Sequence, residues 1–86
     1  MKTLNAFIKA ENAWGKIWGA TPLEVKTSAG RQRVADVIDN KLSPENLTCD
    51  GELDAATVRK NYRLLTMAAK QLKQLDPSIN FYEVEV

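Results

Sequence analysis

The longest uninterrupted helical pattern in the chain, residues 54–75, constrains the fold more than any other feature. This stretch contains no glycine, no proline and, after Asp54 itself, no acidic residue. At about 100° per residue, its apolar side chains fall on one broad face of a helix. They are Val58, Tyr62, Leu64, Leu65, Ala68, Ala69, Leu72 and Leu75. A helix with so wide an apolar face needs other elements to cover it, which predicts a packed helical domain.

The opposite side of this helix carries only positive charge. The residues of this basic stripe are Arg59, Lys60, Arg63, Lys70 and Lys73. All but the flanking Lys60 fall within an arc of about 80°. An exposed helix face usually mixes both signs, because opposite charges spaced i,i+4 stabilise a helix and like charges weaken it. The basic stripe is therefore a candidate binding surface for an anionic partner, either nucleic acid or an acidic protein.

Two ordinary explanations of the basic stripe stay open. The first is a solvent face without a function, because an exposed helix side must be polar. The second is pairing within the chain to the acidic side chains Asp36, Asp39 and Glu45.

Two further helices and one short helical turn are predicted. The first helix covers residues 3–18, with Thr3 as its N-cap and Gly19 as its C-terminal cap. The second covers residues 28–42 and is capped by Thr27 or Ser28. Pro44 at a first helical position predicts a single turn over residues 44–48. The predicted core contains Leu4, Phe7, Trp14, Trp18, Val34, Ile38, Tyr62, Leu65 and Leu72.

Two short segments have the alternating pattern of a β-strand. They are residues 23–27 and the tail, residues 81–86, in which Tyr82, Val84 and Val86 alternate with glutamates. A lone strand is not stable in water. The two segments are therefore expected to pair with each other, or the tail pairs with another molecule as a candidate β-tail interface. The fold class is mainly α in one domain, residues 1–86, and α+β if the pair forms.

Trp14 and Trp18 lie one helical turn apart, on the side of the first helix that carries Phe7. Aromatic residues at this spacing are usually buried, so we expect both in the core. The alternative is an aromatic interface, either a stacking platform for nucleic-acid bases or an anchor for a protein partner.

The composition argues against an enzyme. The chain has no histidine and one cysteine, Cys49, which removes histidine-based triads, histidine general bases, most transition-metal sites and any disulfide within the chain. The acidic stretch around Gly51 lacks the ligand spacing of a calcium loop, and no glycine-rich phosphate loop is present. We therefore expect no catalytic residues, no cofactor and no metal.

The charges, which sum to +1, are segregated along the chain. The first 35 residues are basic, residues 36–56 acidic, residues 57–75 basic and the tail acidic. Such blocks are typical of interaction surfaces. The expected function is a protein-binding module that regulates or inhibits a larger assembly, with homodimerisation as a further option. The alternative is a nucleic-acid-binding accessory protein. A single cysteine, no signal-peptide pattern and no membrane-spanning stretch favour the cytoplasm and no membrane partner.

Overall fold

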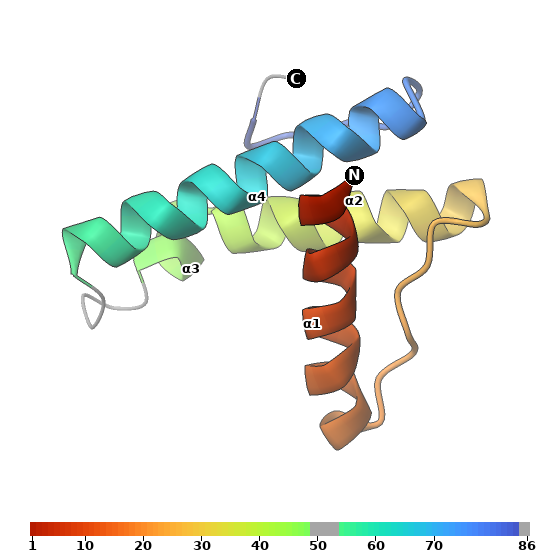
Figure 1. Ribbon diagram of the computed structural model, residues 1–86, viewed down its shortest axis with the longest axis horizontal. Helices are drawn as coiled ribbons and strands as arrows, with labels where there is room; N and C mark the ends of the chain where they lie inside the picture. The colour runs from red at the N-terminus through yellow and green to blue at the C-terminus, as the bar shows by residue number, and fades with distance from the viewer. Residues whose placement is uncertain (49–53, 85–86) are drawn as a thin grey trace.

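The computed structural model describes residues 1–48 and 54–84, which contain four helices (Figure 1). They are α1 (Lys2–Trp18), α2 (Ser28–Leu42), α3 (Pro44–Thr48) and α4 (Ala55–Leu75). Helices α2 and α4 run alongside each other, and α1 crosses them steeply, with its N-terminal end at the crossing (Figure 1). The short α3 lies beside the N-terminal part of α4 (Figure 1). The mainly helical class predicted from the sequence is confirmed.

The helix ends follow from local capping chemistry. The Thr27 hydroxyl accepts a hydrogen bond from the Gly30 N–H at 3.0 Å, and the Asp54 carboxylate accepts one from the Thr57 N–H at 2.7 Å. These bonds satisfy N–H groups that have no partner within the first helical turn. Gly19 ends α1 with a φ of 71°, a left-handed conformation that glycine adopts without steric cost. The predicted caps at Thr27, Asp54 and Gly19 are confirmed.

The predicted N-cap of α1 is wrong. The helix begins at Lys2, so Thr3 lies inside its first turn, and the Thr3 hydroxyl donates to the Met67 sulfur instead. The Leu4 N–H has no acceptor within the first turn of α1. It donates a hydrogen bond to the Gln71 side chain of α4 instead, at 2.8 Å. A tertiary contact thus replaces the local cap and fixes the start of α1 on α4.

The core lies where the three long helices meet. Its buried members are Leu4, Val34, Ala35, Ile38, Leu42, Ala68, Ala69, Leu72 and Ile79. Phe7 and Leu65 are partly buried against this cluster. The expected core positions of Leu4, Val34, Ile38 and Leu72 are confirmed, and all four are fully buried.

Three expected core residues are exposed instead. Trp14 retains 64% and Trp18 78% of its accessible surface, and Tyr62 retains 47%. The tryptophans lie in the half of α1 that projects beyond α2 and α4 (Figure 1), so no helix covers them. Tyr62 lies at the border between the apolar face of α4 and the basic stripe. The core prediction is therefore wrong for these three side chains.

The predicted β pair is absent from residues 1–48 and 54–84, which contain no strand. The Asn12 side chain accepts a hydrogen bond from the Leu23 N–H at 2.6 Å and donates to the Leu23 carbonyl at 3.0 Å. The Arg31 guanidinium donates to the Val25 carbonyl at 2.9 Å. Side chains therefore satisfy backbone groups of residues 23–27 that a neighbouring strand would have paired.

The C-terminal segment is held by α2 rather than by a strand. The buried carboxylate of Asp39 accepts hydrogen bonds from the N–H groups of Tyr82 and Glu83, both at 3.1 Å. Phe81 and Val84 pack against the core, while Tyr82 points into solvent with 83% of its surface accessible. The predicted turn at residues 50–51, Cys49 and Val86 lie outside the described residues.

Candidate interaction surfaces

The basic stripe lies on the side of α4 that faces away from the core. Arg59, Lys60, Arg63 and Lys70 are all exposed, as the helical pattern predicts. The buried residues of α4, Ala68, Ala69 and Leu72, fix this orientation. Four of the five predicted stripe residues thus form one accessible cationic surface along the helix.

Lys73 differs from the other members of the basic stripe. Its side chain is partly buried, and its ammonium group donates to the Ile79 carbonyl. The chain turns back after α4 and brings this carbonyl next to Lys73, while Ile79 itself enters the core. Lys73 therefore helps to hold the C-terminal segment, and it contributes less to the exposed surface than the sequence suggests.

The stripe is not paired with the acidic residues considered above. Asp36 accepts a hydrogen bond from Gln32, Asp39 binds the C-terminal segment, and Glu45 is exposed. The two ion pairs found across residues 1–48 and 54–84 are Arg31–Asp76 at 2.7 Å and Lys41–Glu11 at 3.1 Å. Within these residues, the cationic groups of the stripe other than Lys73 are left to solvent or to a partner.

Apolar side chains interrupt the cationic surface. A shallow depression of about 390 Å³ is lined by Arg59, Tyr62, Arg63, Thr66, Met67 and Lys70. Tyr62 and Met67 keep 47% and 44% of their surface accessible. An aromatic ring and a thioether among arginines can bind a ligand that is both anionic and partly apolar.

A second exposed surface lies on the projecting half of α1. Trp14, Ile17 and Trp18 retain 64%, 70% and 78% of their accessible surface. Together they offer several hundred Å² of apolar surface, since an aromatic side chain alone can bury about 150–250 Å². Patches of this size on a soluble protein commonly mark interaction sites.

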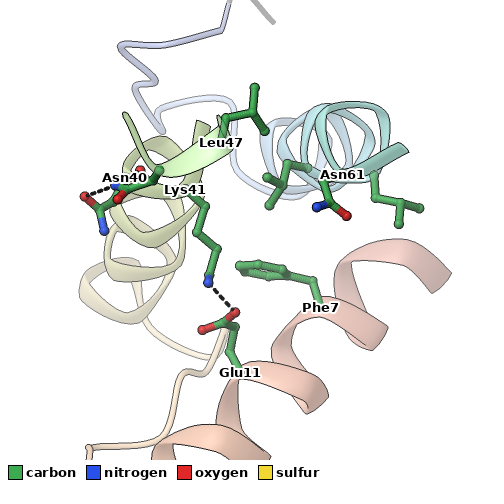
Figure 2. A pocket seen from close by; sticks show the side chains of 9 residues that line it. Phe7, Glu11, Asn40, Lys41, Leu47 and Asn61 are labelled. Atoms are coloured by element: carbon green, nitrogen blue, oxygen red, sulfur yellow. Dashed lines mark hydrogen bonds and ion pairs between the residues drawn. The ribbon is translucent and has the colours of Figure 1, made fainter. Parts of the chain in front are cut away.

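A groove of about 540 Å³ lies between α1 and the other helices (Figure 2). The ring of Phe7 points into it, and the ion pair between Lys41 of α2 and Glu11 of α1 crosses it (Figure 2). Leu64 and Leu65 of α4 add apolar lining. Among the described residues that line the groove, Glu11 is the one carboxylate, and it is paired with Lys41.

Two carboxylates have lowered pKa values, and in both the cause is hydrogen bonding at an end of α4. The Thr57 N–H lowers the pKa of Asp54 by its hydrogen bond to the carboxylate at the start of α4. The Ser78 hydroxyl and then the Arg31 guanidinium lower the pKa of Asp76. No group of three or more potential metal-ligating side chains occurs in the described part of the chain. Both perturbed carboxylates lie at ends of α4, where they fix the fold.

The residues that fix the orientation of these surfaces were not predicted from the sequence. Asn12 binds residues 19–27 to α1, Arg31 joins α2 to the end of α4, and Asp39 anchors the C-terminal segment. Of these, Asp39 carried a usable signal. It is a charged residue next to Ile38 on the apolar side of its helix, and buried charges need partners.

The sequence matches no protein-family model, and comparisons with curated proteins and with solved structures find no significant match. Among the described residues, no helix is both long and apolar enough to cross a membrane.

Proposed function

We propose that the protein is a small, non-enzymatic protein-binding module that regulates or inhibits a larger assembly. The observation that carries this proposal is the exposed apolar cluster Trp14, Ile17 and Trp18 on the projecting half of α1. Tryptophan is enriched among the residues that dominate binding energy at protein interfaces. Exposed tryptophan side chains gain free energy when a partner protein buries them, whereas in the free protein they remain in contact with water.

The basic stripe supports an acidic protein as the partner. Arg59, Lys60, Arg63 and Lys70 give the module a cationic surface, which favours an acidic partner through faster association and selectivity. The absence of histidine from the sequence is in keeping with a binding role rather than catalysis. The single cysteine fits a protein of the cytoplasm, where thiols stay reduced.

A nucleic-acid-binding role is the second candidate. It is favoured by Tyr62, whose half-exposed ring lies among Arg59, Arg63 and Lys70 around one depression. Aromatic rings that stack on bases, next to cations that contact phosphates, are the usual means of binding single strands. This candidate rests on α4, whereas Trp14 and Trp18 form a separate exposed surface on α1.

The two candidates are separated by charge reversal on α4. The test variant is Arg59→Glu/Arg63→Glu, and the matched control Lys26→Glu/Ser28→Glu/Ala29→Glu changes the net charge equally at exposed positions elsewhere. Both positions are exposed, and glutamate is a good helix former, so the test variant is expected to fold. Lys73 is left unchanged because it contacts the Ile79 carbonyl.

Affinity purification of the tagged chain from its source cells should recover a defined protein partner. We expect the partner to be lost with the test variant and kept with the control. In parallel, fluorescence anisotropy with labelled DNA and RNA, single- and double-stranded, is measured at low and near-physiological salt. Salt-sensitive binding that only the test variant loses would replace the protein-binding proposal with the nucleic-acid candidate.

A further inference from the structure

Helix α1 has a second apolar seam, on the side that faces away from the core. Its positions are Ala6, Ala10, Ala13 and Ile17, which alternate in steps of four and three residues. This is the a/d spacing by which one helix packs along another. Ala6, Ala10, Ala13 and Ile17 are all exposed, so the seam is open along most of the helix. The core of the protein uses the other side of α1, through Leu4 and Ile8.

The two edges of this seam differ in chemistry. One edge carries the aromatic residues Phe7 and Trp14, seven residues apart. The other edge carries Lys2, Lys9 and Lys16, also seven residues apart and all exposed. The only acidic residue of α1, Glu11, is paired with Lys41 of α2. The exposed edge opposite the aromatic residues is therefore purely cationic.

We propose that the exposed seam of α1 binds an amphipathic helix of a partner protein, with acidic residues along the edge that meets Lys2, Lys9 and Lys16. This proposal rests on the protein-binding function and names both the surface and the chemical class of the partner. The complex is a two-helix pair in which an apolar stripe of the partner covers the seam of α1 and Trp14.

The small side chains of the seam argue for a helix as the occupant. Ala6, Ala10 and Ala13 follow one another along the seam and leave little side-chain volume above the backbone of α1, so another helix can approach closely. Seventeen residues at 1.5 Å each make α1 about 25 Å long, enough for two heptads of contact. Trp14 and Ile17 then supply bulky groups at the far end, where they cover the partner's apolar stripe.

Charge decides between a foreign helix and a second copy of this chain. In a helix pair, the residues that flank the seam face the flanking residues of the partner and select it by charge. Two antiparallel copies of α1 would place the lysines of one edge against those of the other, which is unfavourable. An acidic edge on the partner pairs with the same lysines instead.

The test uses a designed helical peptide without tryptophan, with leucine and alanine at its a and d positions and glutamate at both edges. A matched peptide carries lysine in place of every glutamate. The readout is the fluorescence of Trp14 and Trp18, the only two tryptophans of the chain. We expect the acidic peptide to shift the emission to shorter wavelength and to reduce quenching by acrylamide, while the lysine peptide does neither.

Three variants locate the binding site. Lys9→Glu/Lys16→Glu should weaken binding of the acidic peptide by about tenfold or more, and Ile17→Asp should weaken it as strongly. The α4 variant Arg59→Glu/Lys70→Glu has the same charge change as Lys9→Glu/Lys16→Glu. It should bind the acidic peptide with an affinity within about twofold of that of the unaltered protein, because substitutions outside the main contacts change the binding energy little. Circular dichroism confirms that all three are folded.

Four results would overturn the proposal: no binding of the acidic peptide, equal binding of the lysine peptide, loss of binding only in the α4 variant, or dimerisation through α1 in sedimentation velocity. None of these results contradicts the protein-binding function if affinity purification still recovers a partner that depends on Arg59 and Arg63. Loss of partner capture altogether, with the peptide still bound to α1, would instead remove the proposed function.

Discussion

The two halves of α1 have similar apolar content but opposite environments. In the N-terminal half, Leu4 is fully buried, its N–H group is bound by Gln71 of α4, and Phe7 and Ile8 pack against the core. In the C-terminal half, Trp14, Ile17 and Trp18 are largely exposed. The tryptophans are larger and gain more from burial than Leu4 does. The difference therefore comes from the position of each half relative to the other helices.

The steep crossing of α1 over α2 and α4 explains this difference (Figure 1). The first three turns of α1, as far as Glu11, reach the other helices, and the remainder projects beyond them (Figure 1). Residues 19–27 return along the projecting half and are fixed by the Asn12 side chain at Leu23. They leave the tryptophans largely uncovered, so a helix that contributes to the core also carries an exposed apolar surface.

The largest expected effect is a difference in the free energy of unfolding between substitutions in the two halves of α1. Replacing Leu4 with alanine should lower the free energy of unfolding by about 3 kcal/mol, because it leaves a cavity in a fully packed core. Trp18→Ala removes a larger side chain but should change the free energy of unfolding by less than about 0.5 kcal/mol. Urea denaturation followed by circular dichroism measures both. Similar losses for the two variants would show that both halves of α1 are buried.

A smaller effect tests the anchor that replaces the expected strand. Asp39→Ala should lower the free energy of unfolding by about 2 kcal/mol, because the N–H groups of Tyr82 and Glu83 lose their charged acceptor. Asp36→Ala, one helical turn away and exposed, is the control and should have little effect. Hydrogen exchange at Tyr82 and Glu83 should accelerate only in the first variant. If the two variants behaved alike, Asp39 would not anchor the C-terminal segment.

The smallest expected effect is a dependence on pH at the junction of α2 and α4. The Ser78 hydroxyl and Arg31 lower the pKa of Asp76 in the folded state below its unfolded value of about 4. The unfolded chain therefore binds this proton more readily, so the stabilisation is complete above about pH 4. It is lost as the pH falls through the lower folded-state pKa.

The variant Asp76→Asn isolates this contribution. Its stability should fall less steeply than that of the unaltered protein when the pH is lowered from about 5 to 2, since asparagine does not titrate. Thermal unfolding at a series of pH values makes the comparison. Asp54→Asn provides the reference for the cap of α4, whose carboxyl pKa is also lowered. An unchanged slope in Asp76→Asn would show that Asp76 does not contribute to acid sensitivity.

Helix positions could be predicted because their signals are local. Thr27, Asp54, Gly19 and the 3.6-residue periodicity act within one or two turns, and the predicted ranges agree closely with the observed helices. The exposed arginines and Lys70 of the basic stripe followed from the same periodicity. Lys73 did not, because its contact with Ile79 depends on the direction in which the chain leaves α4.

The failed predictions concern contacts between residues far apart in the sequence. The expected β pair is replaced by bonds from Asn12, Arg31 and Asp39, and Asp39 reaches residues 43 and 44 positions away. The exposure of Trp14 and Trp18 depends on the crossing of α1, which no local pattern encodes. Helical periodicity predicts which side chains share a face, but not whether another element covers that face along its whole length.

The most direct test of the account is the solvent accessibility of Trp14 and Trp18 in the free protein. Acrylamide quenching of tryptophan fluorescence is measured for the native protein and for the same protein unfolded in urea, at concentrations where sedimentation shows a monomer. We expect long-wavelength emission and a quenching constant in the native protein close to that in the unfolded protein. Short-wavelength emission with a quenching constant several times smaller in the native monomer would show that the tryptophans are buried, and would contradict an open binding surface on α1.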